Sequence, residues 1–169
     1  MICYNINMIE LQKVQFNQLE ELSALASKVW HEAYDVLLGL SQVDYMVESF
    51  QSKQAFENQL ESGYEYYFII GDGMRCGYVG IVQEKDKMFL SKLYLKAEHY
   101  GRGIAQTVLN MLKEESKARG LKSIYLTVNK GNGRAIKAYE RFGFIQTDSI
   151  VTDIGRGFVM DDYVYTFAI

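Results

Sequence analysis

The sequence predicts an α+β fold: a single domain with a central, mostly antiparallel mixed sheet of about seven strands and about four helices. Three observations support this prediction. The chain has 169 residues and is 49% hydrophobic, which suits one domain with its own core. Short β-prone runs end at glycines or charged turns, whereas longer segments carry apolar residues at helical spacing. No linker, repeat or low-complexity segment divides the chain, so we expect residues 1–169 to form one domain.

The first part of the chain predicts a strand followed by a helical region. Residues 8–16, MIELQKVQF, are β-prone. The next segment carries apolar residues on one helical face, and Asn17 precedes Glu20 at the spacing of a capping box. We therefore expect Asn17 to cap this helix. A second helical zone covers residues 41–60, either as one helix or in two pieces.

Three strands joined by turns are predicted next. YEYYFII, residues 64–70, is strongly β-prone, and the turn sequence GDG follows it. CGYVGIVQE and KMFLSKLYLK come afterwards, separated by a charged turn at 84–87. Turn signals of this kind are typical of hairpins.

The remainder alternates helices with strands. A helix over about 102–119 ends at Gly120, which suits the position after a helix C-terminus. A strand at 122–129 and a short helix from about Asn132 to Gly143 follow. The segments FIQTDSIV and FVMDDYVYTFAI then predict an antiparallel pair. The element order is β-αα-β-β-β-α-β-α-β-β.

Composition excludes several classes of protein. The net charge of −3 argues against a general nucleic-acid binder. No apolar run approaches the roughly 18–20 residues needed to span a bilayer, and the first residues lack the basic and apolar regions of a signal peptide. Cys3 and Cys76 lack metal-site spacing, so we interpret them as free thiols in a reducing cytoplasm. The two histidines are too few for a usual metal cluster, and no metal is expected. Translation starts at Met1 or at Met8.

The charges are unevenly distributed. Residues 1–70 have a balance of −7 and residues 71–169 a balance of +4. One interpretation is an acidic half that meets a cation and a basic half that meets an anion. The alternative is chance combined with solvated helix faces.

A glycine-rich loop precedes the predicted helix at 102–119. A helix N-terminus presents unpaired amide groups and a partial positive charge, and phosphate binds well there. Glycine lets the backbone approach such a ligand, and an arginine between two glycines adds charge. The residues that line a pyrophosphate in this interpretation are Gly101, Arg102, Gly103, Ile104 and Ala105. A plain tight turn is the alternative, because neither the P-loop nor the dinucleotide fingerprint is present.

A second segment, LTVNKGNGRAIKAYERFGF, combines with this loop. Together they resemble the GNAT superfamily of acyl-CoA-dependent N-acyltransferases, whose phosphate loop reads Gln/Arg-x-x-Gly-x-Gly/Ala. Gly103 and Ala105 match it, and Tyr100 stands where Gln or Arg is usual. The family's later pattern is V-N-x-x-N-x-x-A-x-x-x-Y-x-x-x-G-F. All its fixed positions are matched, by Val128, Asn129, Asn132, Ala135, Tyr139, Gly143 and Phe144.

The resemblance is close over residues 64–145, and the element order extends it over nearly the whole chain. It implies the acyl-CoA N-acyltransferase fold and transfer of an acetyl group from acetyl-CoA to a primary amine. The segments VWHEAY and DIGRGFVMDDYVY are similar to those of bacterial small-molecule amine acetyltransferases, the polyamine-type enzymes among them.

The resemblance also implies roles for individual residues. The backbone of Leu93 and Leu95 would pair with the pantetheine arm of the cofactor, and one of these amides would stabilise the oxyanion. Asn132 would contact the arm, with helix capping as its alternative or additional role. Tyr139 would act as general acid toward the leaving thiolate. A core aromatic packed beside Ile136 and Phe142 is the alternative for Tyr139.

The acceptor side is less defined. The strand at 87–96 offers no carboxylate as a base, whereas Glu32 and Asp35 are available to bind a cationic acceptor or pass its proton to water. Solvated helix charges are the alternative for both. Three cations, Lys130, Arg134 and Lys137, are candidates for the cofactor's 3′-phosphate, with plain surface charge as the alternative.

Three functions remain open at this point. The first is an N-acetyltransferase for a small-molecule amine. The second is an acetyltransferase for protein N-termini or lysines, and the third is a non-catalytic acyl-CoA-binding sensor. No membrane or nucleic-acid partner is expected. The final strand, YVYTFAI, would be exposed and available to pair with a second copy, so a homodimer is also a prediction.

Overall fold

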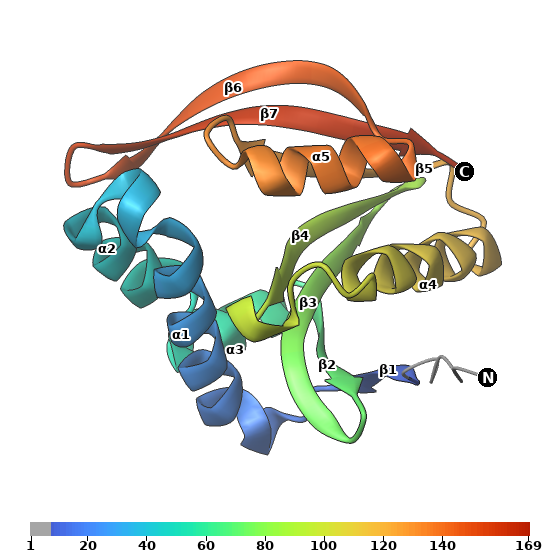
Figure 1. Ribbon diagram of the computed structural model, residues 1–169, viewed down its shortest axis with the longest axis horizontal. Coiled ribbons are helices and arrows are strands. Elements are labelled where there is room, and N and C mark those ends of the chain that lie inside the picture. Colours follow the sequence, from blue (N-terminus) through green and yellow to red (C-terminus); the bar gives the residue numbers. More distant parts are fainter. Residues whose placement is uncertain (1–7) are drawn as a thin grey trace, which may run out of the picture.

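The computed structural model describes residues 8–169; Cys3 and Met1 lie outside the described residues. Within this range the chain forms seven strands and five α-helices (Figure 1). The strands are β1 Ile9–Lys13, β2 Glu65–Gly71, β3 Met74–Glu84, β4 Lys87–Leu95, β5 Ser123–Asn129, β6 Ile145–Gly155 and β7 Phe158–Ala168. The helices are α1 Leu19–Leu38, α2 Leu40–Phe50, α3 Lys53–Glu61, α4 Ile104–Ala118 and α5 Gly133–Phe142.

The seven strands form one sheet in the order β1-β2-β3-β4-β5-β7-β6. Neighbouring strands are antiparallel except β4 and β5, which are parallel. The predicted mixed, mostly antiparallel sheet is therefore confirmed. Parallel neighbours need a long crossover connection, and α4 provides it between β4 and β5.

Helices cover both faces of the sheet, because its central strands are apolar on both sides. In β2, Phe68 packs with the cluster that contains α1, α2 and α3, whereas its neighbour Ile69 packs with the cluster that contains α4. Successive strand residues point to opposite faces, so these adjacent side chains enter two separate cores. The sheet thus lies between α1–α3 on one side and α4 and α5 on the other (Figure 1).

Two details of the helical region differ from the prediction. The zone at 41–60 is two helices, because the chain turns at Gln51 and the Ser52 side chain accepts a hydrogen bond from the Ala55 amide at 3.2 Å to begin α3. There are consequently five helices in the described chain, against about four predicted. The predicted cap at Asn17 is wrong. A short 3₁₀ turn at Phe16–Gln18 precedes α1, and the residue before the helix is Gln18.

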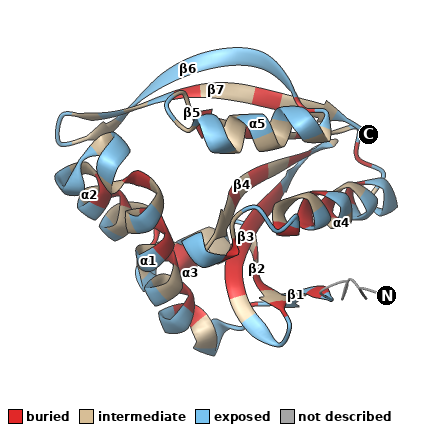
Figure 2. Cartoon of the chain, in the orientation of Figure 1, coloured by how far each residue is buried: buried red, intermediate tan, exposed pale blue. Residues whose placement is uncertain are grey.

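The predicted exposed tail strand is also corrected. β7 lies inside the sheet between β5 and β6, and β6 forms the edge. Figure 2 shows β6 exposed along most of its length, and its first nine residues are all exposed. A homodimer stays a prediction, with β6 in place of β7 as the available edge. Across residues 8–169, no helix combines the length and apolar character needed to cross a bilayer.

Candidate active site

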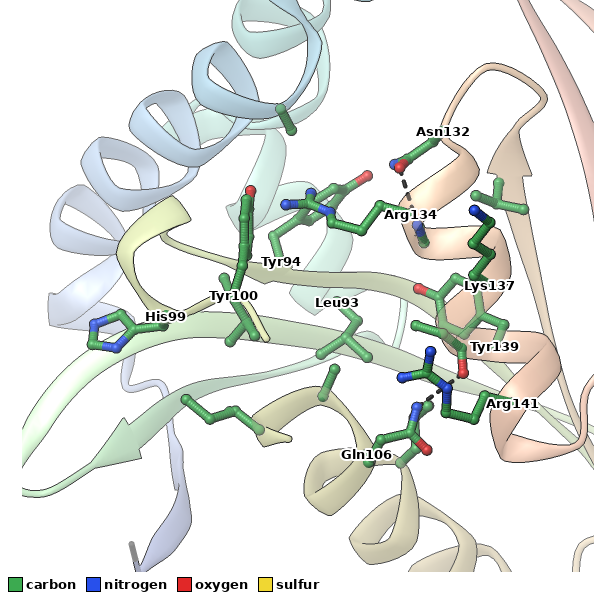
Figure 3. Close-up of a pocket in the computed structure, with 18 of the residues that line it drawn as sticks. Leu93, Tyr94, His99, Tyr100, Gln106, Asn132, Arg134, Lys137, Tyr139 and Arg141 are labelled. Carbon is green, nitrogen blue, oxygen red and sulfur yellow. Dashed lines mark hydrogen bonds between the residues drawn. The ribbon is translucent and has the colours of Figure 1, made fainter. Parts of the chain in front are cut away.

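The two parallel strands pair over a short distance only. Residues 87–89 of β4 pair with 123–125 of β5. Beyond this point β4 stays paired to β3 as far as Leu95, and β5 stays paired to β7 as far as Asn129. Their facing edges therefore lack partners within the sheet. A cavity of about 340 Å³ opens here, lined by both strands and by α4 and α5 (Figure 3).

β4 contains a bulge where it separates from β5. Ile81 of β3 pairs with Leu90 and Gly80 pairs with Lys92, so Ser91 has no partner on β3. A bulge bends its strand and changes the direction of the following residues. Leu93 and Leu95 follow the bulge, and both line the cavity.

The glycine loop forms one wall of this cavity. Gly101 and Gly103 have φ values of +72° and +76°, in the left-handed region that favours glycine. Gly103 is the residue before α4, and within residues 8–169 no side chain caps this helix. The amides of its first turn are therefore free to bind an anion. All five residues predicted for a pyrophosphate site, 101–105, line the cavity.

Cationic side chains surround the same loop. Four of them line the cavity, namely Arg102, Arg134, Lys137 and Arg141. The guanidinium of Arg134 stacks over the Tyr100 ring, with its Cζ 3.3 Å from the ring centroid (Figure 3). Stacking holds the guanidinium plane while its N–H groups stay available to an anion. Lys130 does not line this cavity; its Nζ lies 2.5 Å from Asp161.

Tyr139 of α5 lies half-buried in the cavity wall. Its ring meets that of Phe144 edge to face, with centroids 5.6 Å apart. A tyrosine hydroxyl is protonated at neutral pH, and burial, with a smaller contribution from Tyr34, raises the pKa of Tyr139 further. Tyr139 therefore has a core contact and also presents a protonated group to the cavity.

Asn132 combines two contacts. Its side-chain oxygen accepts a hydrogen bond from the Ala135 amide at 3.2 Å and so caps α5. Its Nδ2 donates to the Tyr34 hydroxyl at 3.3 Å, and that hydroxyl lies 3.4 Å from the Tyr94 hydroxyl. The capping interaction predicted for Asn132 is thus present, and the side chain also lines the cavity.

A second cavity, of about 670 Å³, lies on the other side of the strand separation. It is lined by α1, α2 and α3 together with β4–β7. Aromatic residues dominate part of its wall, including Trp30, Tyr34, Tyr64 and Tyr94. The two cavities share five lining residues, which are Tyr34, Ser91, Tyr94, Thr127 and Val128. They therefore meet where β4 and β5 diverge.

The second cavity contains buried ionisable groups. Asp162 is 3% exposed, and burial raises its pKa to about 6. Lys92 is also buried; its Nζ donates to the Tyr66 hydroxyl at 2.7 Å and to Gln59 at 3.2 Å. Burial lowers the pKa of Lys92 to about 7. Asp153 lines the same cavity.

The predicted acceptor residues lie elsewhere. Glu32 accepts a hydrogen bond from the Ala97 amide at 3.0 Å, and Asp35 lies 2.8 Å from His31. Neither residue lines the two cavities, so the geometry does not support their predicted role. The carboxylates of the second cavity come instead from the half of the chain with the positive charge balance. Asp162 was missed, although it shares a strand face with the apolar Met160 and Val164, an unusual position for a charged residue.

This arrangement can bring two substrates together. Amides and cations at one end of the first cavity suit an anion, and the unpaired strand edges suit an extended polar arm. Tyr139 offers a proton in the same cavity. The second cavity supplies room for a nucleophile that arrives from the opposite face.

Comparison with known proteins agrees with this description. The chain matches the model of the acetyltransferase (GNAT) family over residues 30–144. It is 25% identical over 158 residues to a spermidine N(1)-acetyltransferase of Thermoplasma acidophilum, which covers 90% of this chain and 96% of that protein. The fold is similar to that of the PaiA N-acetyltransferase of the same organism, solved in complex with coenzyme A, with a TM-score of 0.80, 22% identity and coverage of 96% and 99%.

A further similar structure is the ribosomal-protein-S18-alanine N-acetyltransferase of Escherichia coli, with a TM-score of 0.69, 17% identity and coverage of 96% and 94%. At these identities the solved structures establish the fold alone. The family match covers more than half of the chain, including the glycine loop and the segment around Tyr139. The chain therefore belongs to the acetyltransferase (GNAT) family and is an N-acetyltransferase that uses acetyl-CoA as its co-substrate.

Proposed function

We propose that this enzyme transfers the acetyl group of acetyl-CoA to a primary amine of a small molecule, by direct attack of the amine on the thioester. The observation that carries this proposal is the meeting of two cavities at the separation of β4 and β5, with five lining residues in common. An amine that enters through the second cavity meets the first cavity at this junction, and no covalent enzyme intermediate is needed.

The residues of the first cavity fit coenzyme A. The uncapped amides at 104–105 and the side chain of Arg102 suit the pyrophosphate, and Arg134 and Lys137 suit the 3′-phosphate. The free edge of β4 at Leu93 and Leu95 suits the amide groups of the pantetheine arm. One of these backbone amides stabilises the developing oxyanion.

Tyr139 protonates the departing thiolate in this proposal. Its hydroxyl is protonated at neutral pH, as in an ordinary tyrosine, and Tyr139 lines the cavity that the sulfur enters. Asn132 fixes the start of α5, the helix that carries Tyr139, through its cap on Ala135.

The position of the β6–β7 hairpin favours a small acceptor over a peptide. The β6–β7 hairpin reaches α2, where the Tyr45 hydroxyl donates to the Ile154 carbonyl at 2.5 Å and Gln42 donates to the Val159 carbonyl at 2.8 Å. Arg156 at the hairpin tip also lies 3.9 Å from Glu48. A hairpin held against α2 in this way limits the room for a longer peptide beside the second cavity in this proposal.

An amine of the polyamine class agrees with the lining of the second cavity. Aromatic faces and carboxylates both attract ammonium groups, and the wall of this cavity contains both. The spermidine N(1)-acetyltransferase of T. acidophilum, a relative along nearly the whole chain, supports the same class.

Release of free thiol from acetyl-CoA tests this function. The purified protein is assayed with spermidine, spermine, putrescine and simple monoamines, and in parallel with peptides that carry an N-terminal alanine or an internal lysine. We expect turnover with small amines and little with peptides. Preference for a peptide would contradict the proposed acceptor class. Tight acetyl-CoA binding without transfer to any acceptor would indicate a sensor.

A further inference from the structure

Asp162 contains an atom that the fold leaves without a partner. Its Oδ1 is the one buried side-chain nitrogen or oxygen atom in the described part of the chain that lacks a hydrogen bond. The residue is 3% exposed, and it lies on β7 opposite Asn129 of β5 and Ile150 of β6. Its side chain lines the second cavity. An unsatisfied carboxylate oxygen in such a position is costly, and a ligand that supplies the missing donor explains its presence.

The nearby cations are engaged by other groups. Lys130, at the end of β5, pairs with Asp161 rather than with Asp162. Lys92 of β4 directs its Nζ to Tyr66 and Gln59. Over residues 8–169, no ion pair includes Asp162.

The other ionisable groups near Asp162 do not neutralise it. Asp161, the preceding residue on β7, raises the pKa of Asp162, and Lys130 lowers it by a smaller amount; burial is the largest effect. From α1 the neutral Tyr34 faces the same cavity, and from β6 so does Asp153. The resulting pKa of about 6 leaves Asp162 mostly ionised at neutral pH, yet more basic than an ordinary aspartate.

The remaining wall of the cavity suits a cation. Trp30, Tyr34 and Tyr94 form an aromatic cluster, with ring centroids 5.0 Å apart for Trp30 and Tyr34 and 5.2 Å apart for Trp30 and Tyr94. Ring faces attract ammonium groups. Tyr34 and Tyr94 also line the first cavity, so this wall extends to the junction of the two cavities.

We propose that Asp162 binds the ammonium group of the acceptor and accepts the proton that must leave before the amine can attack. This inference rests on the proposed function, since it names the residue that activates the acceptor in that reaction. The base is thereby assigned to β7, because the strand at 87–96 offers no carboxylate for this role.

The proton balance is complete without a further reactant. The acceptor ammonium gives one proton to the Asp162 carboxylate and becomes a neutral amine. The amine nitrogen forms a bond to the thioester carbon, and the carbon–sulfur bond breaks. Tyr139 protonates the thiolate, and its proton is replaced by the second proton lost from the nitrogen. Asp162 then releases its proton to solvent, so one proton is released for each acetyl group transferred.

Asp162→Asn tests the proposal, with Asp161→Asn as the matched control. Both changes remove one carboxylate of β7, but Asp161 lines neither cavity. We expect Asp162→Asn to lower kcat/KM for the amine by about 10²–10⁴-fold and to abolish the decline of wild-type kcat/KM below about pH 6. The control should keep the rate at neutral pH and should also keep a decline at acid pH, displaced to lower pH because Asp161 raises the pKa of Asp162. Acetyl-CoA affinity, measured by calorimetry, stays unchanged in both variants.

An amine series separates proton transfer from simple attraction. 2,2,2-Trifluoroethylamine, whose three fluorines leave it mostly neutral at pH 7, needs no base to become a nucleophile. We therefore expect Asp162→Asn to cost much less with this acceptor than with spermidine. An equal loss with both acceptors, or a rise in the acceptor KM alone with the acid limb intact, would overturn the proposal. An acid limb that persists in Asp162→Asn and disappears in Lys92→Met would overturn it as well.

A titration provides a readout that does not depend on turnover. The side-chain carboxyl carbon of Asp162, followed by NMR, should titrate near pH 6 in the wild-type protein and at lower pH when spermidine is present, since a bound cation favours the ionised carboxylate. A titration that spermidine leaves unchanged would contradict the assignment. A wild-type enzyme that transfers acetyl groups to no small amine would contradict the proposed function instead, which keeps the two failures distinct.

Discussion

The two cavities are built in different ways, although they share one junction. The first is lined mainly by three short segments, which are the part of β4 around its bulge, the loop before α4, and the turn and helix after β5. The contacts proposed there for coenzyme A are mostly backbone groups and cations. The second is formed by side chains from three helices and four strands. A backbone-built site serves a substrate that is the same throughout the family, whereas a site built from scattered side chains can change its substrate one residue at a time.

The largest effect expected on the cofactor side comes from Tyr139→Phe. Loss of the hydroxyl should lower kcat by about 10²–10⁴-fold, because the thiolate then departs without a proton donor. Acetyl-CoA affinity should change little, since the ring and its contact with Phe144 are kept. Steady-state kinetics and calorimetry measure the two quantities.

Tyr125→Phe is the control for that change. Tyr125 donates a hydrogen bond to Glu84 at 2.6 Å and lines neither cavity. Its loss should leave kcat within about twofold of the wild-type value. Wild-type turnover in Tyr139→Phe would remove Tyr139 from the chemistry and would leave its contact with Phe144 as its role.

Lys92→Met tests how much folding stability is lost by burying the Lys92 ammonium group in the second cavity. The pKa of Lys92 is lowered from 10.5 to about 7 by burial, so between these values the unfolded chain binds a proton that the folded chain does not. Wild-type stability therefore falls as pH decreases from 10.5 to 7. As pH decreases through this range, the free energy of unfolding of Lys92→Met should rise relative to that of the wild type by on the order of 3 kcal/mol. Urea unfolding at pH 7 and pH 10 measures it, and a difference that does not depend on pH would contradict the expectation.

Asp162→Asn should be more stable than the wild type at neutral pH. Because the pKa of Asp162 is raised from 3.8 to about 6, the folded chain binds more protons than the unfolded chain between these values. Wild-type stability is therefore lost as pH rises from about 4 to 6, and the variant avoids this loss. We expect a gain on the order of 2 kcal/mol at pH 7 that disappears near pH 4. Thermal unfolding at several pH values, with Asp161→Asn alongside, measures it; an equal gain in the control would show that the effect is not specific to the cavity.

Gly103→Ala tests the glycine loop of the first cavity, and Gly73→Ala is its matched control. The two glycines have φ values of +76° and +75°, and an added Cβ at either meets no atom within 4 Å. Both variants should lose about 1 kcal/mol of stability through the same backbone strain. Gly103→Ala alone should also weaken acetyl-CoA binding, by about tenfold, because Gly103 precedes α4 and lines the cavity whereas Gly73 lies in the β2–β3 turn. Equal acetyl-CoA affinity in the two variants would contradict the proposal that the loop at 101–105 binds acetyl-CoA.

The difference between the cavities also explains what the sequence could predict. The strands, the position of α5 and the loop at 101–105 were predicted because each depends on local spacing. For the helical zone at 41–60, the sequence predicts either one helix or two pieces. The break at Ser52 depends on the hydrogen bond that its side chain accepts from the Ala55 amide, and the sequence does not show whether a serine makes such a bond. The start of α1 was misplaced, since Asn17 has the spacing of a cap but lies in a 3₁₀ turn.

The acceptor side could not be predicted in the same way. Glu32 and Asp35 are predicted because the strand at 87–96 lacks a carboxylate, but in the structure they contact the Ala97 amide and His31. Asp162 lines the second cavity because β7 lies between β5 and β6 in the sheet. Strand order depends on contacts between residues far apart in the chain, and local patterns contain little information about them.

The short pairing of β4 with β5 has a consequence for the protein as a whole. Three residue pairs provide the backbone ladder between the four strands on one side and the three on the other. An extended pantetheine arm that bonds to both free edges would continue that ladder where the polypeptide leaves it incomplete. Amide hydrogens along residues 90–95 and 126–129 should then exchange more slowly with solvent deuterium once acetyl-CoA is bound. The co-substrate would thus complete the sheet as well as supply the acetyl group.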